Sequence, residues 1–573
     1  MGEEERGEEE RDGIEPGRRL IRVGADGGVS LADRIAQGLH RLSWRTPLHE
    51  MRLKGRYPLK LIAVPDDPLA GDAARGRALL AERIEFRGET HDLATLDVAR
   101  ADWGAAFGRY LQSFDWLRDL SIVATRAQAA PIAEALTARW LDAHADKVAG
   151  EAWRAAAWGR RMVMWTAHAP LILSSTDLIY RSRVLNALAR GARHLERGAD
   201  KAPGAERVIA WAGVIVAGLL IPGGEARRHG GEAGLARALT AALFDDGGTV
   251  SRSPEDLLAI VETLACLRAA YAARRLELPD AATRACVRIV PALLGVTLGD
   301  WGLGSWQGGA PVVAARVAAV IAASGVRTRP LRQARDWGYQ RLAGGGTVLV
   351  IDAAPPPVAR VVDGGCASTL AFELSDGAMR LVVNCGGARA ARAGLPAALL
   401  TGLRTTAAHS TLCLANTNST AIQPDGTLGR GVTEVELSRL ESEGASRVDA
   451  AHDGYQRRFG LRHRRQLVLA GDGRELRGED SLLPAGRRAR GGVAFAIRFH
   501  LGAGAEAMAE DEDAALQGPG GEQWLFRCRG GALAVEDSLW IDAEGRAVAT
   551  RQLVVTGEAP AGGASLSWVL RKV

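Results

Sequence analysis

Lysine is nearly missing from this sequence. Of its 72 basic residues five are Lys, which leaves 72 − 5 = 67 Arg beside 67 acidic residues, for a net charge of +5. Arginine carries a planar fork of donors that binds carboxylate, sulfate or phosphate in a bidentate manner, so anionic ligands are one explanation. A GC-rich genome that encodes much Ala, Gly and Arg is the other. The sequence has no basic run with interleaved aromatic residues, so we expect no nucleic-acid partner.

Cysteine pairs and long apolar runs are also lacking. Six Cys residues are scattered along the chain without a C-x-x-C pair, which argues against a disulfide framework or a zinc-knuckle pattern. The longest apolar run, Val208 to Ile221, is shorter than the roughly 20 residues that span a bilayer, and it ends at Pro222. We therefore expect a buried helix there and no transmembrane segment.

No secretory signal is recognisable at the N-terminus. Residues Met1 to Arg11 are dominated by Glu and lack a basic region followed by an apolar one. This composition predicts a cytoplasmic protein whose first dozen residues are disordered.

The length of 573 residues requires more than one hydrophobic core. After a charged, partly disordered segment over residues 1–40, helical spacing dominates residues 41–335. From Trp153 to Leu173, for example, Trp158, Met162 and Trp165 fall on one helical face. Successive helices separated by short Gly and Pro clusters predict an all-α domain.

Residues 336–573 change to a period of two, which is typical of strands. Leu370 to Leu374 and Met379 to Asn384 flank a Ser-Asp-Gly turn, and a second hairpin is centred on Gly471-Asp472-Gly473. Val493 to His500 places alternate apolar residues on one face. The pattern predicts a large antiparallel β-sandwich, and so an α+β chain of two unlike domains.

Several stretches resemble the heparinase II/III-like family of polysaccharide lyases, in particular its alphaproteobacterial branch, from about Phe86 onward. They are Phe107 to Leu120 (FGRYLQSFDWLRDL), Ala192 to Glu196 (ARHLE), Asp246 to Glu255 (DGGTVSRSPE), Leu370 to Gly386 (LAFELSDGAMRLVVNCG), Ala408 to Ser419 (AHSTLCLANTNS), His452 to Arg465 (HDGYQRRFGLRHRR) and Arg498 to Leu501 (RFHL). Their order and spacing carry the resemblance.

The resemblance implies an incomplete (α/α) toroid packed on a β-sandwich, with an acidic polysaccharide as partner. It implies β-elimination at a uronic acid, which needs a group that neutralises the carboxylate, a base and an acid. Tyr and His usually serve as base and acid in the family. The family also makes the periplasm or cell envelope an alternative location.

The sequence departs from the family at the positions that matter most. Asp256 stands where the resemblance places the catalytic tyrosine. The stretch resembling H-x-H-x-D is Gly364 to Ser368 here and lacks both histidines. Asn384 replaces a metal-binding aspartate of some members, and His409 alone is retained from that cluster.

Two hypotheses follow: a diverged lyase that uses other groups, or a non-catalytic glycan-binding or cell-envelope scaffold of the same fold. For the lyase, the candidate catalytic residues are Arg252, Asp256, His409, Tyr455 and His463, with His168 and His452 also considered. The candidate substrate-binding residues are Arg193, His194, Trp301, Trp306 and Asn384. A glycoside hydrolase on the same toroid would need two carboxylates about 5 to 10 Å apart, and Asp256 has no evident partner in the sequence.

Each candidate also has a structural explanation. Ser253 and Pro254 are typical of a helix N-cap and first helical residue, which explains much of the SRSPE motif but not Arg252. Arg252 is therefore the preferred carboxylate-binding residue. Cys366, Asn384 and His409 form a conceivable zinc set, but Asn is a poor zinc ligand, so we expect no metal and no cofactor.

Overall fold

The computed structural model describes residue 14 and residues 17–22, 46–55, 57–357, 364–389, 391–486 and 492–573. The disorder predicted for the first dozen residues lies outside these residues. Within the N-terminal segment, however, Gly17–Arg22 forms a strand, β1, where the composition had predicted a charged and partly disordered stretch.

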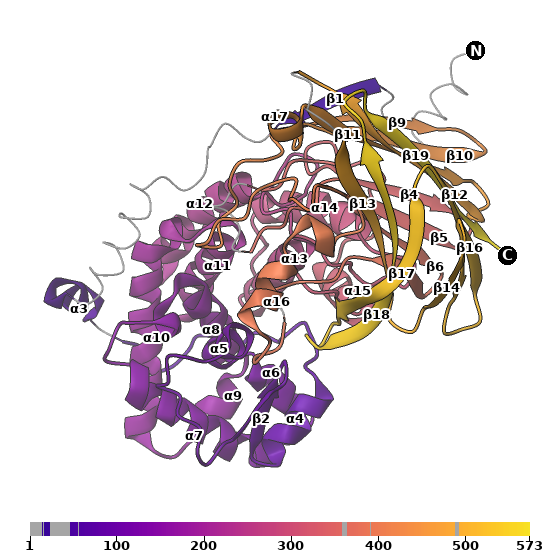
Figure 1. The fold of residues 1–573 in the computed structure, drawn as a ribbon. Coiled ribbons are helices and arrows are strands. Elements are labelled where there is room, and N and C mark those ends of the chain that lie inside the picture. The colour runs from indigo at the N-terminus through magenta and orange to yellow at the C-terminus, as the bar shows by residue number, and fades with distance from the viewer. Residues whose placement is uncertain are drawn as a thin grey trace.

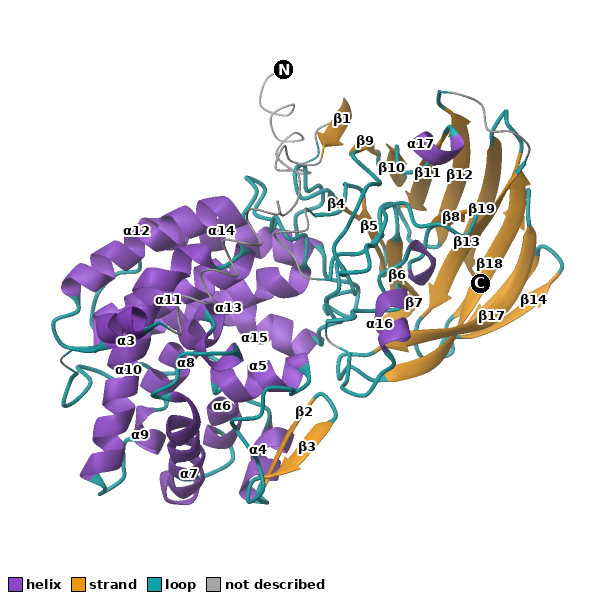
Figure 2. Ribbon diagram, turned by 60° about the vertical axis from the view of Figure 1, so that its left-hand side comes forward, coloured by secondary structure: helices purple, strands orange, loops and turns teal. Residues whose placement is uncertain are grey.

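The first half of the chain is helical (Figures 1 and 2). In chain order its helices are α3 (Pro47–Leu53), α4 (Ala73–Leu80), α5 (Ala105–Ser113), α6 (Trp116–Ser121), α7 (Arg126–His144), α8 (Ala155–Ala167), α9 (Ala169–Ile172), α10 (Leu178–Gly198), α11 (Gly204–Leu220), α12 (Glu225–Ala242), α13 (Pro254–Ala273), α14 (Asp280–Gly295) and α15 (Ala314–Ser324). A small hairpin of β2 (Arg83–Phe86) and β3 (Glu89–Asp92) lies beside α4. The apolar run Val208 to Ile221 forms most of α11 and is buried except for the half-buried Ile209, as predicted.

The second half forms two packed antiparallel sheets. One sheet has the order β1-β9-β10-β11-β12-β19-β16-β15-β14, and the other has the order β17-β18-β13-β7-β6-β5-β4, with β8 beside β13. The strands are β4 (Tyr339–Gly344), β5 (Thr347–Asp352), β6 (Phe372–Asp376), β7 (Met379–Val383), β8 (Leu412–Leu414), β9 (Glu434–Glu441), β10 (Ala445–His452), β11 (Leu461–Ala470), β12 (Glu475–Pro484), β13 (Val493–Leu501), β14 (Glu506–Glu510), β15 (Asp513–Gln517), β16 (Gln523–Arg529), β17 (Ala532–Ile541), β18 (Ala547–Ala559) and β19 (Ala564–Lys572). The two short helices here are α16 (Ala397–Gly402) and α17 (Gln456–Phe459). Both predicted hairpins, β6–β7 and β11–β12, are present.

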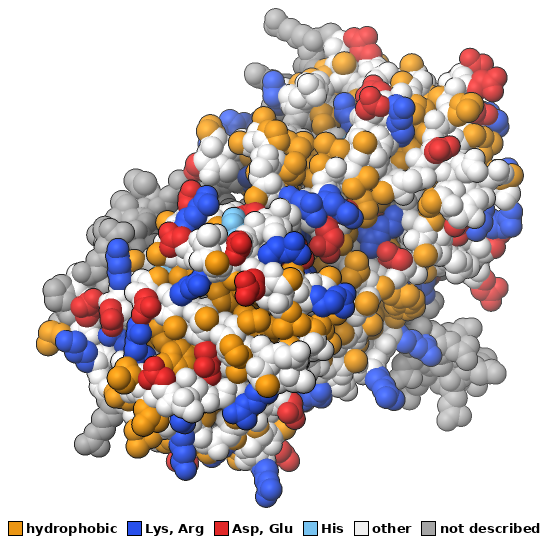
Figure 3. Space-filling view, turned by 90° about the horizontal axis from the view of Figure 1, so that it is seen from below, with side chains coloured by type: hydrophobic (Ala, Val, Ile, Leu, Met, Phe, Trp, Pro, Cys, Tyr) orange, Lys and Arg blue, Asp and Glu red, His pale blue; other side chains and the backbone are white. Residues whose placement is uncertain are grey.

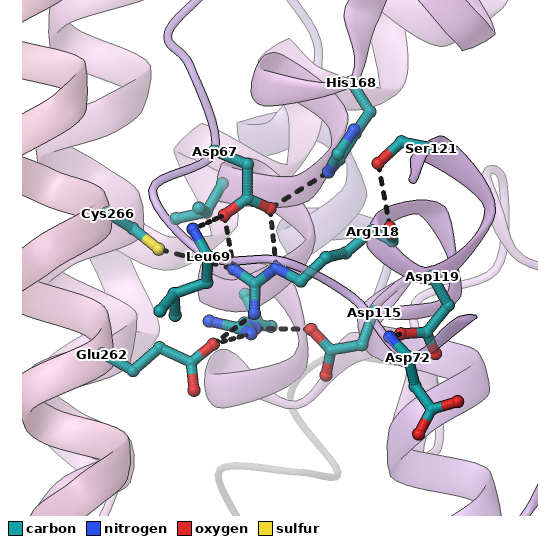
Figure 4. Close-up of polar contacts among 12 residues, drawn as sticks. Asp67, Leu69, Asp72, Asp115, Arg118, Asp119, Ser121, His168, Glu262 and Cys266 are labelled. Atoms are coloured by element: carbon teal, nitrogen blue, oxygen red, sulfur yellow. Dashed lines mark hydrogen bonds and ion pairs between the residues drawn. The ribbon is translucent and has the colours of Figure 1, made fainter. Parts of the chain in front are cut away.

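A buried charge network holds the helical domain together (Figure 4). The Arg118 guanidinium on α6 donates to both oxygens of Asp67 at 2.7 and 2.8 Å and to Glu262 on α13 at 2.6 Å. Glu262 also accepts from Arg160 on α8 and Arg316 on α15. The Glu262 carboxylate thus joins four helices, α6, α8, α13 and α15, and Arg118 links them to Asp67 in the segment before α4. When one partner of a buried, hydrogen-bonded ion pair is removed, the charge of the other partner remains buried and uncompensated.

The two domains are joined through the stretch that contains Arg252. Before it, Asp246 Oδ2 accepts hydrogen bonds from the backbone N–H groups of Asp336 and Trp337, each at 2.8 Å. The Trp337 ring packs so closely on Gly248 that a Cβ there would lie 2.0 Å from it. The helical domain therefore holds the chain at the point where it enters the sandwich.

Arg252 completes this joint. It is 3% exposed and has a positive φ of 56°, an uncommon backbone conformation for a residue other than Gly. Its guanidinium donates to the carbonyls of Trp337, Ala354 and Pro355, and to Asp352 Oδ1 at 2.6 Å. Asp352, at the end of β5, is fully buried. The pair is a buried charged link between the two cores.

The sandwich has a polar network of its own. His463 on β11 donates from Nε2 to Asp480 Oδ1 at 2.7 Å, and its Nδ1 lies 3.3 Å from His452 Nε2. Arg465 also binds Asp480, at 2.8 and 3.1 Å, and reaches the carbonyl of Ser410. Burial lowers the pKa of His463, although Asp480 opposes this shift, and burial together with the neighbouring His463 lowers the pKa of His452. Both rings are therefore held neutral.

We expect Arg252→Ala to lower the free energy of unfolding by about 3 to 5 kcal/mol, because it leaves the buried Asp352 carboxylate without its cation. Denaturant unfolding of the full chain measures this. The matched control is Arg551→Ala, which removes an arginine from an exposed pair with Asp537, and which we expect to change stability by less than about 1 kcal/mol. An Arg252→Ala protein as stable as the control would contradict this role.

Stability should fall as the pH drops below about 6.5, the ordinary His value. Burial lowers the pKa of His452 and His463, and that of His500 to about 3, so the unfolded state gains protons that the folded state does not. Between pH 7.5 and 5.5 each buried histidine should remove about 1 kcal/mol. The measurement is the unfolding midpoint at both pH values. His463→Gln should reduce the pH dependence, and an unchanged dependence would contradict the neutral state assigned to His463.

Candidate functional site at the domain junction

The first turn of α13 carries the position where the resemblance placed a catalytic tyrosine. Ser253 caps the helix by accepting from the Asp256 N–H at 3.4 Å, and Pro254 is the first helical residue, both as predicted. Glu255 and Asp256 follow in the first turn, where carboxylates are favoured by the positive end of the helix dipole. The local sequence thus places Asp256 at the edge of the helical domain.

Asp256 faces an arginine from the sandwich. Arg389, in the loop after β7, lies 3.3 Å from Asp256 Oδ1 and 3.8 Å from Glu255 Oε2, and it donates to Ser253 Oγ at 2.8 Å. Burial alone would lower the pKa of Arg389, but the carboxylates of Asp256 and Glu255 raise it. The side chains of Asp256 and Arg389 are 21% and 22% exposed. We call Ser253, Glu255, Asp256 and Arg389 the junction cluster.

The stretch that lacks the family histidines packs directly behind this cluster. Ser368 Oγ donates to Asp352 Oδ2 at 2.7 Å, and the side-chain amide of Gln307 donates to Ser368 Oγ at 2.9 Å. The Gln307 carbonyl accepts from the Cys366 N–H at 3.0 Å. Where the family places histidines, this chain has a small, buried hydrogen-bond network that supports the Arg252–Asp352 pair.

The retained histidine, His409, is 2% exposed. Its Nδ1 donates to the Thr405 carbonyl at 2.7 Å, which leaves Nε2 as the unprotonated nitrogen. Burial lowers its pKa, although the hydrogen bond to Thr405 opposes the shift. His409 is a neutral ring held by the backbone, which fits the structural explanation at least as well as a catalytic one.

Asn384 is fully buried and its amide is engaged on both sides. It donates to Glu373 Oε1 at 3.0 Å and accepts from the Ser410 N–H at 3.0 Å. These contacts favour a structural role for Asn384 over the predicted contact with a substrate. Within the described residues, His, Cys, Asp and Glu side chains form no group of three or more that could hold a metal ion.

The preferred carboxylate-binding residue, Arg252, is directed at protein acceptors. Its four hydrogen bonds to three carbonyls and Asp352 favour a structural role over the predicted contact with a uronate. Its unusual position before an N-cap is explained by the domain joint.

Tyr455 and His463 do not meet the junction cluster. Tyr455 is 1% exposed, donates to the Leu412 carbonyl at 3.0 Å and belongs to the sandwich core. Burial raises its pKa well above the ordinary value. His463 belongs to the buried network with Asp480. These contacts favour the alternative that both residues are structural.

The histidine and arginine candidates of the helical domain lie in three other places. Arg193 on α10 donates to the Leu53 carbonyl at 2.9 Å, and His194 bonds to the Trp153 carbonyl at 2.8 Å. His168 binds Asp67 in the charge network at 3.1 Å. The structure does not bring these three residues to Asp256.

The two tryptophans of the glycine-rich loop differ. Trp306 is 1% exposed and packs edge-on against Tyr339, which favours the alternative of packing within the loop over the predicted sugar platform. Trp301 is 56% exposed with a positive φ of 62°. Trp301 therefore keeps the exposed indole face that sugar stacking requires.

A cavity of about 390 Å³ lies away from the junction cluster, between residues 64–68 and the C-terminal half of α13. Alanines of α13 line it together with Asp66 and Arg268, and none of the predicted site residues does.

Charges on the surface are mixed in sign. On the face seen in Figure 3, basic and acidic side chains are interspersed among hydrophobic ones. Many arginines are paired with carboxylates, as in the exposed pairs Arg183–Asp142 and Arg527–Asp513. The arginine content therefore does not by itself indicate an anionic ligand.

Three important residues were missed by the sequence analysis: Arg389, Gln307 and Asp352. Arg389 lies 133 residues from Asp256, and Asp352 lies 100 residues from Arg252. No local spacing links such partners. The one available signal was Arg252 itself, because a helix N-cap needs no arginine at that position. An unexplained arginine indicates a buried acidic partner as readily as it indicates a ligand.

In the described part of the chain, no helix combines the length and apolar character that a bilayer crossing needs.

Known proteins resemble this chain in both sequence and fold. Residues 326–569 match the family model for the heparinase II/III-like C-terminal region. FtsZ-localized protein C of Caulobacter vibrioides is 31% identical over 97% of this chain and 96% of the relative. Among solved structures, heparinase III superposes with a TM-score of 0.68 at 13% identity, covering 97% of this chain and 93% of that one. A heparan sulfate lyase of Pedobacter heparinus, in a mutant form, gives 0.61 at 14% identity, covering 96% and 92%.

The solved structures are too distant in sequence to show more than the fold, and they confirm the predicted toroid followed by a β-sandwich. The relative that is alike along nearly its whole length shows the family. The chain belongs to the heparinase II/III-like family.

Proposed function

We propose that this protein is a non-catalytic member of the family that serves as a glycan-binding scaffold in cell division. The observation that carries the proposal is the ion pair between Asp256 and Arg389 at the position of the family's catalytic tyrosine. A residue that must exchange a proton with a sugar is replaced by one that joins the two domains.

The chemistry of elimination supports this proposal. A carboxylate at position 256 repels the uronate carboxylate that a lyase must hold, and Arg389, which could neutralise a uronate, is already paired with Asp256. Tyr455 is buried with its hydroxyl bonded to a carbonyl, so it is not available as the acid. The three groups that β-elimination needs are therefore not assembled around one sugar position.

Glycan binding does not require these groups. Trp301 presents an exposed indole on the glycine-rich loop, and aromatic faces are suited to stacking on sugar rings. We propose that an acidic polysaccharide is bound without being cleaved, with Trp301 as one contact.

The division context rests on the relative. A protein named for its localisation with FtsZ is 31% identical to this chain along nearly the whole of both sequences. We propose that this chain also associates with FtsZ and works at the division site.

The loss of elimination is tested with a panel of uronate polysaccharides, including heparan and chondroitin sulfates, while the ultraviolet absorbance of the unsaturated product is recorded. We expect no increase for the full chain under conditions in which an active lyase is readily detected. Asp256→Asn is the matched control and should give the same baseline. Product formation by the native chain that Asp256→Asn abolishes would contradict the proposal.

The association with FtsZ is tested by sedimentation. The full chain should pellet with FtsZ polymers formed in GTP and stay in the supernatant when GDP prevents assembly. Equal amounts of the chain in the pellet with and without polymers would rule out this part of the proposal.

A further inference from the structure

The N-terminal strand β1 forms one edge of the nine-stranded sheet. Gly17–Arg22 pairs antiparallel with β9, from Gly17 opposite Arg439 to Arg22 opposite Glu434. Figure 1 shows β1 in indigo against β9, beside strands that follow it by hundreds of residues. Without β1, the edge of β9 would be open, and open edges are templates for pairing with another chain.

The two strands have complementary charge. β1 has the sequence GRRLIR, and β9 has the sequence EVELSRLE. Arg18 lies 3.9 Å from Glu436, Arg22 lies 3.7 Å from Glu434, and Arg19 reaches Asp336 at 2.7 Å. Opposite charges across neighbouring strands favour one partner and one register. The edge therefore selects an extended segment of basic character.

The side chains of β1 hold it only lightly. Ile21 is its one buried residue, and Leu20 is 43% exposed. The side chains of Arg18 and Arg22 are 80% and 71% exposed, and exposed ion pairs contribute little. Arg462 of β11 already binds Glu436 at 2.8 Å, so this carboxylate has a cation even without β1. Backbone hydrogen bonds to β9 therefore contribute most of the stabilisation of β1. Any strand of the same pattern can form the same backbone hydrogen bonds.

We propose that two copies of this chain exchange their β1 strands. In the resulting dimer, the β1 of each copy pairs with the β9 of the other copy. A second copy carries the same arginines at the same spacing, and reciprocal exchange leaves neither edge open. The chain from residue 23 to residue 46 can extend to at most about 80 Å, which permits pairing within one copy or between two. Residues 23 to 46 tether β1 to its own copy and so favour pairing within that copy. Exchange between two copies competes with this pairing and therefore increases with protein concentration.

The test uses single cysteines at paired positions, since the six native cysteines are all buried. One chain carries Leu20→Cys and a second, distinguishable in size by a tag, carries Glu436→Cys; these positions face each other in the β1–β9 register. After mixing and mild oxidation, we expect a disulfide-linked heterodimer whose yield rises with concentration. The control partner is Met508→Cys, an exposed position at the opposite edge of the sheet, which should link at background level.

A double variant with both Leu20→Cys and Glu436→Cys in one chain checks the pairing itself. If it closes within the chain while the mixture gives no more heterodimer than the Met508→Cys control, exchange is excluded. If the double variant does not close at all, the β1–β9 pairing is wrong and the proposal fails with it. Adding Arg18→Glu and Arg22→Glu to the Leu20→Cys chain should reduce the heterodimer yield several-fold, because like charges would then face Glu436 and Glu434 across the two strands. An unchanged yield would overturn the basic character assigned to the occupant.

Discussion

The buried ion pair between Arg252 and Asp352 is the contact on which the arrangement of the two domains depends. Each partner belongs to a different core, both side chains are almost completely buried, and Arg252 also holds three carbonyls of the entering chain. A charge removed from water is tolerated when it is paired and hydrogen-bonded on this scale, and breaking one partner is costly. This accounts for the motif DGGTVSRSPE without a catalytic role: Asp246 and Gly248 hold Trp337, Arg252 holds Asp352, and Ser253 begins α13.

The same junction explains why a lyase fold need not be a lyase. The first turn of α13 is fixed by the joint, so the residue at position 256 faces the sandwich in any case. With Asp at this position and Arg389 opposite, that geometry produces a further interdomain ion pair at the position where the sequence resemblance places a catalytic tyrosine. The histidines that would assist are replaced by a network of Gln307, Ser368 and Asp352, whose polar atoms satisfy one another. These side chains bind one another, as the proposed non-catalytic function requires.

Local patterns predicted the elements well and the contacts between them poorly. Helical spacing predicted α8, the apolar run predicted α11, turn residues predicted the hairpins β6–β7 and β11–β12, and capping rules predicted Ser253 and Pro254 correctly. The contact of Arg252 with Asp352, which favours a structural role, could not be predicted because the two residues are 100 positions apart. Trp301 and Trp306 lie in one glycine-rich loop, yet Trp301 is exposed and Trp306 is buried. The difference comes from the packing of Trp306 against Tyr339, which no sequence periodicity indicates. The strand β1 was missed because its identity as a strand comes from β9, far along the chain.

The central claim is that position 256 now carries a structural interaction. A double-mutant cycle on unfolding free energy, with Asp256→Asn, Arg389→Gln and the double variant of the full chain, measures that interaction directly. We expect the single variants to be non-additive, with a coupling energy of about 0.5 kcal/mol or more, as for residues in direct contact. Additive effects would show that Asp256 and Arg389 do not stabilise each other and would contradict the account.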